Sequence, residues 1–542
     1  MKKKRMSFLS ILLILILLLM GCATTVEEAP SNVGTTENQN SAAADTITIS
    51  SSKVVVDTDF TAKDLEVGYE ESTATKIILN EDSIAVSGDG ASATKNILTI
   101  KQEGSYVLEG TLNDGQIIVD AGDNDKIRIV LKGAEITNQT NAPIYIKNAD
   151  KVFITLADGT DNSLTDGADY VQTDENDVDG VIYSMSDLTL NGSGSLTITG
   201  KYKHGIVSKD ELVITGGNYN ITTIKDAING KDCVKIKDGE FTLSSVTGDG
   251  IQSKNSDDST KGYVYISGGT INILQSEEGI EGTAIIIEDG VITVNATDDG
   301  FNAVSASADT TVTEAADDEV VALSSATTDT SAKDNTITRG PGEMKRGDVP
   351  EGQIPRGDFS GGDKGRGSFP GGKDAFVVDE NCYILISGGT ITVNAQGDGL
   401  DSNGSLYISG GMVYVNGPTE SMNGSIDYTG TGEITGGIVI ITGSAGMAQG
   451  FGETSTQCSL LYNLSSSATA DTTVNLTNST GKEILRYTPS KQYQSIVISS
   501  PELVQGETYT LTCGDQTAQI TLTSITTSNG QSVGFGQRGM SR

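Results

Sequence analysis

Acidic residues recur at one fixed position of a repeated sequence unit. Twelve or thirteen residues after each of six repeated isoleucines stands a carboxylate: Asp226, Asp249, Glu278, Asp299, Asp398 and Glu420. Three residues further on stands a second oxygen-bearing side chain: Asn229, Gln252, Glu281, Asn302, Asp401 and Asn423. Carboxylate and amide oxygens are the ligands that Ca²⁺ takes in proteins. The spacing therefore predicts a ladder of cation sites.

Stacked carboxylates need a counter-charge. If each unit forms one coil of a solenoid, the acids lie about 5 Å apart, and unit charges at that distance repel by about 1 kcal/mol even in water. Calcium would offset this repulsion by binding several oxygens at once. The expected ligands are Asp226, Asn229, Asp249, Glu278, Glu281, Asp299, Asn302, Asp398 and Asp401. The alternative is a hydrated acidic edge that only keeps the protein soluble.

Lysines recur close to the same acids. Lys209, Lys231 and Lys254 stand in successive units. They are candidates for binding the carboxylate of an acid sugar, or for the base of a β-elimination beside calcium. The simpler interpretation is that they pair with neighbouring aspartates at the surface.

Aromatic side chains provide a second candidate for sugar binding. Tyr265, Tyr383 and Tyr407 fall near one another in the repeat alignment and are expected on the surface, where tyrosines stack on sugar rings. The chain has one His. It therefore lacks the Ser-His-Asp or Cys-His arrangement of a nucleophilic enzyme.

The elements that must position these residues follow from the repeat. The register isoleucines are Ile214, Ile236, Ile266, Ile287, Ile386 and Ile408, so one unit has about 22 residues, with a long insertion before Ile386. Such a unit cannot bury its own apolar face and must stack on its neighbours. We expect an all-β fold, a right-handed parallel β-helix, in which Val264, Ile266, Ile271 and Ile273 point inward. A β-sandwich is the alternative, which the fixed register disfavours.

Composition supports this class and excludes others. The 542 residues carry a net charge of −36, so nucleic acid is not an expected partner. There are 65 Gly, no Trp and 5% aromatic residues, as in a Gly-punctuated β repeat. Cys233 and Cys382 lie three coils apart, about 14 Å, too far for a disulfide. Cys458 and Cys513 could pair.

The N-terminus predicts export and anchoring. Four basic residues, 2–5, precede a short apolar run that ends in Leu19-Met20-Gly21-Cys22, which looks like a bacterial lipobox with Cys22 as the lipidated residue. We expect a monomer on the extracellular face of the bacterial cell membrane, bound to it by the lipid alone. The expected parts are a signal peptide (1–21), a disordered tether (22–45), N-terminal coils (46–180), the β-helix (181–445) with a disordered insert (307–380), and a C-terminal β-rich cap (446–542).

Several motifs resemble one known family. The lipobox, the segments 187–190 and 211–217, and the repeated Asp-Gly-Ile and Ser-Lys-Asp elements resemble the carbohydrate-binding domain-containing family typified by a clostridial β-helix lipoprotein that binds cellulose and acid sugars. The resemblance covers about 75–445 without the insert. It implies a polysaccharide-lyase-like β-helix with bound calcium and affinity for plant-wall polymers. The ligand assignment is best matched at Asp249, Asp299 and Asp398, where Asp-Gly precedes an apolar residue.

These observations predict a calcium-dependent, surface-anchored binder of polysaccharide, either acidic or of the plant wall, such as polygalacturonate or cellulose. Two alternatives stay open. One is a calcium-dependent polysaccharide lyase with Lys209, Lys231 or Lys254 as base. The other is an adhesin or structural surface protein in which calcium only rigidifies the solenoid.

Overall fold

The computed structural model describes residues 56–305 and 378–530. All regular structure in these residues is β-strand, as the sequence predicts. This part of the chain contains no helix of the length and apolarity that a membrane crossing requires. The predicted signal peptide, Cys22, the tether and all but the last three residues of the insert lie outside the described residues.

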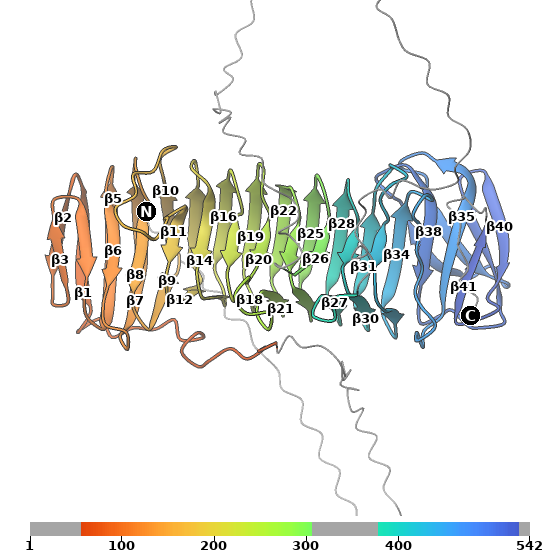
Figure 1. Ribbon diagram of the computed structural model, residues 1–542, viewed down its shortest axis with the longest axis horizontal. Helices are drawn as coiled ribbons and strands as arrows, with labels where there is room; N and C mark the ends of the chain where they lie inside the picture. The colour runs from red at the N-terminus through yellow and green to blue at the C-terminus, as the bar shows by residue number, and fades with distance from the viewer. Residues whose placement is uncertain (1–55, 306–377, 531–542) are drawn as a thin grey trace, which may run out of the picture. The chain divides into compact units, whose positions relative to one another are not determined.

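Successive coils lie side by side and contribute one strand to each of three parallel arrays, here called faces 1, 2 and 3 (Figure 1). Face 1 consists of β7 (Lys126–Thr137), β9 (Lys151–Leu156), β12 (Asp187–Gly192), β15 (Glu211–Ile214), β18 (Cys233–Ile236), β21 (Tyr263–Ile266), β24 (Ala284–Ile287), β27 (Tyr383–Ile386), β30 (Ser405–Ile408) and β33 (Gly432–Ile434). Face 2 begins with the end of β7 and continues with β10 (Asp161–Thr165), β13 (Ser195–Thr199), β16 (Asn218–Thr223), β19 (Glu240–Ser245), β22 (Thr270–Ser276), β25 (Val291–Ala296), β28 (Thr390–Ala395), β31 (Met412–Asn416) and β34 (Ile438–Gly443).

Face 3 is narrower, because most of its strands are three residues long. It consists of β4 (Ile97–Ile100), β6 (Gln116–Asp120), β8 (Ile144–Asn148), β11 (Gly180–Ser184), β14 (His204–Ser208), β17 (Ile228–Gly230), β20 (Ile251–Ser253), β23 (Ile280–Gly282), β26 (Phe301–Ala303), β29 (Leu400–Ser402) and β32 (Ile426–Tyr428). A three-residue strand presents a single outward side chain between two inward ones. Face 3 therefore carries one central column of outward residues.

The predicted register is confirmed. Residues on neighbouring face 1 strands pair in the order Ile214, Ile236, Ile266, Ile287, Ile386 and Ile408. The predicted inward residues Val264, Ile266, Ile271 and Ile273 have no exposed surface and belong to one continuous core cluster. Each fully buried aliphatic side chain of this kind contributes about 1.5–3 kcal/mol to stability. Parallel pairing throughout these arrays excludes the β-sandwich for this part of the chain.

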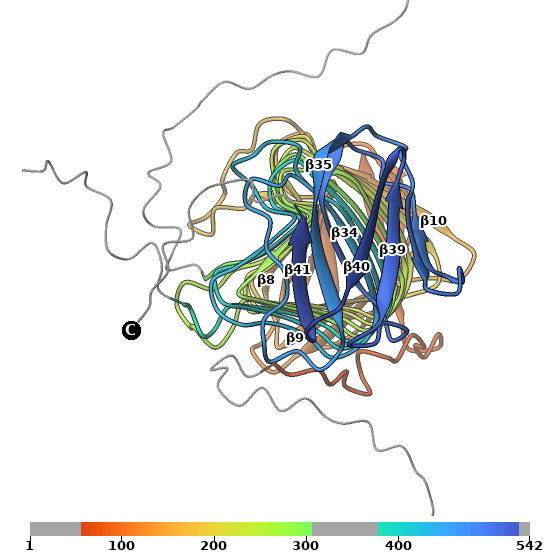
Figure 2. The ribbon, with the colours of Figure 1, turned by 90° about the vertical axis from the view of Figure 1, so that its right-hand side faces the viewer.

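Antiparallel strands stand at both ends of the stack. At the N-terminal end β1 (Thr75–Glu81) pairs with β2 (Ser83–Ser87), and β3 (Ala91–Thr94) pairs with β4, while β5 (Gly104–Leu112) links β1 to β7. At the C-terminal end, nearest the viewer in Figure 2, β34 pairs antiparallel with β38 (Tyr493–Ser499). The remaining strands are β35 (Ser459–Ala468), β36 (Val474–Asn478), β37 (Glu483–Tyr487), β39 (Thr508–Cys513), β40 (Gln516–Thr521) and β41 (Thr526–Gly530).

The four described cysteines are all free thiols. Cys233 and Cys382 lie at strands three steps apart on face 1, in agreement with the prediction that they do not pair. Cys458 and Cys513, which the sequence left able to pair, are buried without a disulfide.

Candidate functional site

The acidic ladder runs along face 3 in two columns. The first column lies in the turns that precede the short strands and contains Asp226, Asp249, Glu278, Asp299 and Asp398. The second is the central outward column of face 3 and pairs in the order Asn229, Gln252, Glu281, Asn302, Asp401 and Asp427. The sequence assigned Glu420 and Asn423 to the last coil, and this is wrong. Asp427, not Asn423, occupies the second-column position of this coil, because residues 418–424 form an additional loop. Glu420 lies in that loop and is exposed.

Turn carboxylates join neighbouring coils. The backbone N–H of Asp249 donates to Asp226 Oδ1 (3.0 Å), and that of Glu278 donates to Asp249 Oδ1 (3.2 Å). Farther along, the N–H of Asp398 donates to Asp299 Oδ1 (2.5 Å). One carboxylate oxygen of Asp226, Asp249 and Asp299 therefore holds the next coil in place, and the second oxygen of each is left for other partners.

Amides satisfy the carboxylates at the start of the ladder. Asn229 Nδ2 donates to Asp226 Oδ2 (2.7 Å) and to Gln252 Oε1 (2.9 Å). Gln252 Nε2 donates to Asp249 Oδ2 (2.6 Å). His204 also lies beside Asp226, with Nδ1 3.2 Å from Oδ2. Although burial alone would raise the pKa of Asp226, these partners together lower it. Both carboxylate oxygens of Asp226 are therefore satisfied by the protein itself, whereas Asp249 also belongs to a group of converging carboxylates.

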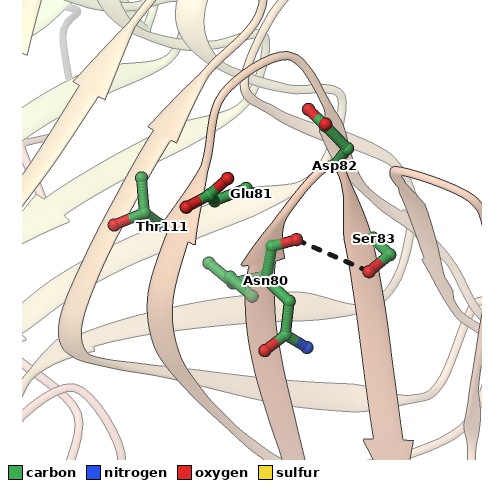
Figure 3. A pocket seen from close by; sticks show the side chains of 6 residues that line it. Asn80, Glu81, Asp82, Ser83 and Thr111 are labelled. Carbon is green, nitrogen blue, oxygen red and sulfur yellow. Dashed lines mark hydrogen bonds between the residues drawn. The ribbon is translucent and has the colours of Figure 1, made fainter.

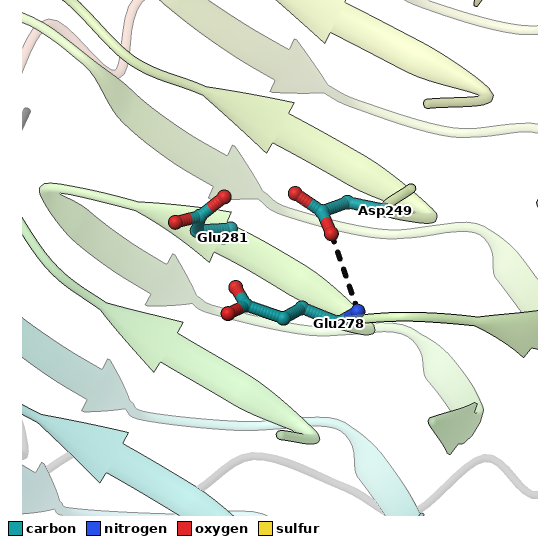
Figure 4. Close-up of side chains that lie close together, drawn as sticks. All are labelled: Asp249, Glu278 and Glu281. Carbon is teal, nitrogen blue, oxygen red and sulfur yellow. Dashed lines mark hydrogen bonds between the residues drawn. The ribbon is translucent and has the colours of Figure 1, made fainter. Parts of the chain in front are cut away.

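Further along the ladder than Asp226, carboxylates converge in two groups of three. Asp249, Glu278 and Glu281 point toward one another (Figure 4), and each offers an oxygen within 4.8 Å of the others. Asp398, Asp401 and Asp427 form a second group with the same spacing. We call these the first and second triads. In the first, Lys254 Nζ lies 2.6 Å from Glu281 Oε1 and supplies one positive charge.

Two buried oxygens at the first triad have no hydrogen-bond partner among the described residues. They are Glu278 Oε2 and Asn302 Oδ1. Buried polar atoms without a partner are rare in folded proteins and commonly mark the place of an ion or water. The donors are all oxygens and carry several negative charges, which is the set that a hard divalent cation binds. Both triads therefore fit such an ion.

Burial makes these carboxyls weak acids when no cation neutralises them. It raises the pKa of Glu278 to about 9, with a further contribution from Glu281. It raises the pKa of Asp401 to about 8, with contributions from Asp299 and Asp398. The pKa values of Asp299 and Asp398 rise to about 7 and about 6 for the same reason. Glu278 and Asp401 therefore hold protons at neutral pH unless a cation displaces them.

This protonation predicts how stability depends on pH. Unfolded carboxyls titrate near pH 4, so the folded protein retains more protons than the unfolded chain between about pH 4 and pH 9. Stability without a cation is therefore fully present below about pH 4 and is lost as the pH rises through 6 to 9. We expect the melting temperature in chelator to fall between pH 5 and pH 9. A melting temperature that rises over this range would contradict the assignment.

The glycine of the Asp-Gly-apolar motif keeps adjacent coils close. A Cβ on Gly300 would lie 2.2 Å from Val393 Cγ1 and 2.4 Å from the carbonyl oxygen of Gly399. A Cβ on Gly399 would lie 2.4 Å from the carbonyl oxygen of Ser425. Neither residue has a positive φ. Space between coils, rather than a special turn conformation, requires glycine beside the ladder.

The lysines predicted to bind ligand all contact other residues. Lys209 Nζ lies over the ring of Tyr183, at 5.2 Å from its centroid. Lys231 pairs with Asp257 at 2.5 Å, and Lys254 with Glu281. Pairing with neighbouring acids, the simpler interpretation, describes Lys231 and Lys254.

The tyrosines are not together on an open surface. Tyr265 and Tyr383 are 4% and 5% exposed, so the expectation of exposure is wrong for both. Tyr265 is buried because Phe60 packs against it from the N-terminal segment, with ring centroids 6.0 Å apart. Tyr407 is half-buried on β30, three strands from Tyr265 on face 1. All three tyrosines lie on face 1 rather than on face 3, so they are not part of the ladder.

The ladder begins at Asp226 for a structural reason. On the preceding strands the central column of face 3 is Tyr145, Tyr183 and Val207, which pack with Val178 in a small buried cluster. The loop between β10 and β11 covers this cluster, and Tyr183 donates to the carbonyl oxygen of Asn176 (2.5 Å). Polar outward residues start where this loop ends.

A separate open hollow lies at the β1–β2 turn (Figure 3). Its lining includes Asn80, Glu81, Asp82, Ser83 and Thr111. The labelled side chains in Figure 3 are polar and spread apart, and the hydrogen bond drawn there joins the Ser83 hydroxyl to the Asn80 carbonyl (3.5 Å). It has none of the converging charges of the triads, which therefore remain the candidate site.

Comparison with known proteins gives a consistent description. A family model described as "carbohydrate-binding domain-containing protein" matches residues 94–350. A protein of Acetivibrio thermocellus with the same description is 41% identical over 209 residues, which cover 38% of this chain and 73% of the relative. A solved structure, described as a polysaccharide lyase-like protein from C. thermocellum in a gadolinium derivative, is 37% identical. The match covers 42% of this chain and 90% of the solved chain, with a TM-score of 0.38.

Proposed function

The chain belongs to the carbohydrate-binding domain-containing family, and on this premise we propose that it binds an acidic polysaccharide through calcium held at the two triads. The observation that carries the proposal is the convergence of three buried or half-buried carboxylates at each triad, together with the unpartnered oxygens of Glu278 and Asn302 at the first. Asp249, Glu278, Glu281 and Asn302 would hold one ion. Asp398, Asp401 and Asp427 would hold another.

Calcium would make an acidic surface able to bind an acidic polymer. In a chain of net charge −36, a polyuronate meets electrostatic repulsion at a bare row of carboxylates. A bound Ca²⁺ has six to eight oxygen ligands, so an ion held by three protein carboxylates has coordination positions left for sugar carboxylates. When bound, the ion supplies the positive charge that bridges the two. The protein fixes the spacing of the ions along face 3.

The wider proposal keeps the predicted location. In it, Cys22 is lipidated, the protein stands on the extracellular face of the cell membrane, and the solenoid is right-handed with β35–β41 as its cap. Nearly all parallel crossover connections have this hand. Extracellular calcium suits sites of modest affinity. The test is binding of polygalacturonate to the purified protein in calcium and in chelator. Equal binding in both would remove calcium from the proposal.

Face 2 favours a second, neutral ligand. On the six strands from β13 to β28 the outward positions are Ser195, Thr197, Thr199, Asn218, Asn220, Thr222, Glu240, Thr242, Ser244, Thr270, Asn272, Leu274, Gln275, Val291, Thr293, Asn295, Thr390, Thr392 and Asn394, with Leu274 and Gln275 both outward at a bulge. Glu240 is the one charged residue among them, although 20% of the whole chain is charged. The strands repeat about every 4.8 Å. We propose that this regular hydroxyl and amide surface binds a neutral plant-wall glycan such as cellulose.

Charges placed on face 2 test this assignment. We expect Thr242→Glu with Thr293→Glu to reduce the amount bound to insoluble cellulose by about tenfold, because each carboxylate would lose hydration against an uncharged surface. Ser72→Glu with Ser467→Glu, at exposed positions outside face 2, is the control for the added charge. Calcium-dependent binding of polygalacturonate should be unchanged. Unchanged binding of the face 2 variant to cellulose would contradict the assignment.

A further inference from the structure

Residues 56–66 form a strap across the outward side of face 1, irregular from 56 to 61 and turned at 62–65. Asp64 is its main anchor and is 2% exposed. Its Oδ1 lies 2.9 Å from Lys151 Nζ and accepts from the Thr189 hydroxyl (2.6 Å), while its backbone oxygen accepts from Asn191 Nδ2 (3.0 Å) and the Thr215 hydroxyl (2.9 Å). The strap is therefore fixed by donors from β9, β12 and the end of β15.

A second anchor lies nearer the start of the strap. Lys235 is 3% exposed, and its Nζ lies 3.0 Å from Asp57 Oδ2 and 2.9 Å from the Asp59 carbonyl oxygen. The Tyr263 hydroxyl donates to the carbonyl oxygen of Asp57 (3.1 Å). Phe60 packs on Tyr265, and Lys237 Nζ lies 5.4 Å from the centroid of the Phe60 ring.

The surface under the strap is basic in an acidic protein. Two outward columns of face 1 lie there, one of Phe153, Thr189, Val213 and Lys235, the other of Thr155, Asn191, Thr215 and Lys237. Neither column contains an acid as far as Lys235 and Lys237, although the second continues through Ser267 to Glu288. Arg128 adds a guanidinium over Phe153, 5.0 Å from its ring centroid. Two acids of face 1, Asp187 and Glu211, follow Lys151 in its own column, which lies outside these two. We call the two columns with Arg128 and Lys151 the basic track.

The chemistry of the contacts identifies what else the track could bind. Lysines that meet carboxylates, hydroxyl and amide donors that meet oxygens, and aromatic rings beside them make up a site for anionic, oxygen-rich chains. Lys151 and Lys235 stand three strands apart, or about 14 Å along the stack. A single small anion would meet one of them, whereas a linear polymer would meet both.

We propose that the basic track is a second polyanion-binding site, which needs no metal and which the strap occupies as an internal competitor. The strap places Asp57 and Asp64 where anionic groups of the polymer, carboxylate or phosphate, would lie. Because residues 67–74 connect the strap directly to β1, its local concentration at the track is high, and an external polymer competes poorly until the strap is released. This inference does not depend on calcium at the triads.

Strap variants of the full chain test the proposal in chelator, where the triads hold no calcium. Asp57→Asn with Asp64→Asn removes both anchoring charges with little change of shape. Polymer affinity should rise by about tenfold or more. Asp59→Asn with Asp82→Asn is the matched control, because it removes the same two charges from exposed acid side chains outside the anchoring contacts. Polygalacturonate and polyphosphate, used separately, distinguish carboxylate from phosphate ligands.

Two further measurements decide the outcome. Adding Lys151→Met and Lys235→Met to the released variant should return binding to the level of the unaltered chain. Hydrogen exchange of residues 56–66 should increase in the released variant and, in the unaltered chain, on addition of saturating polymer. If exchange shows a released strap while affinity for both polymers stays unchanged, the proposal is wrong. Failure here leaves the calcium-dependent binding intact, since that is measured in calcium with an intact strap.

Discussion

Replacing Asp398 and Asp401 by asparagine is expected to lower calcium affinity at the second triad by about a hundredfold. Both residues offer carboxylate oxygens within 4.8 Å of Asp427, and the double substitution leaves one formal negative charge of three. Loss of a charged ligand costs at least about 1.4 kcal/mol, or a factor of ten in affinity for each. Calorimetric titration of calcium into the metal-free protein should show one class of sites missing.

The control for this variant is Asp238→Asn with Asp289→Asn. Both residues are exposed acids at the corner between faces 1 and 2, so the net charge changes equally without a change at either triad. The control should bind calcium like the unaltered protein. If the two double variants lose calcium affinity to the same extent, general electrostatics, rather than coordination at the triad, accounts for binding.

Gly300→Ala is expected to destabilise the protein by about 3 kcal/mol. The added methyl group would lie 2.2 Å from Val393 Cγ1 and 2.4 Å from the carbonyl oxygen of Gly399, and the latter is backbone that cannot move without separating two coils. Overpacking of this kind costs about 1–3 kcal/mol, and more where backbone must shift. Chemical denaturation followed by circular dichroism measures the loss.

Gly68→Ala is the matched control for this prediction. A Cβ at Gly68 would have no atom within 4 Å. Its unfolding midpoint should stay close to that of the unaltered chain. A Gly300→Ala protein as stable as the control would show that adjacent coils separate at little cost, and that the glycine is not required for close stacking.

Much of the solenoid could be predicted because the same physics repeats in every coil. Isoleucines at a fixed spacing gave the register, and the acids counted from them led to the ladder from Asp226 to Asp401. Counting failed at the last coil, where an additional loop displaces the ladder position to Asp427. A local signal was present there, since Ile426-Asp427 repeats the apolar-acid pair of Leu400-Asp401.

The covering of face 1 could not be predicted in the same way. Tyr265 was expected at the surface because it alternates with buried residues, and its side chain does point out of the coil. The strap that covers it stands about 200 residues earlier in the sequence and is polar, as a solvent-exposed linker would be. Its contacts depend on single pairs such as Asp57 with Lys235, and single pairs leave no periodic pattern.

Titration of the metal-free protein with calcium, and then with polygalacturonate in the presence and absence of the ion, tests the central proposal most directly. We expect calcium to bind at two classes of sites, one for each triad, and the polymer to bind measurably only when calcium is present. Calcium binding should also release protons into the buffer, because carboxyls with pKa values of about 6 to 9 must ionise. A protein that binds neither calcium nor polymer would contradict the account and leave the ladder as a hydrated acidic edge.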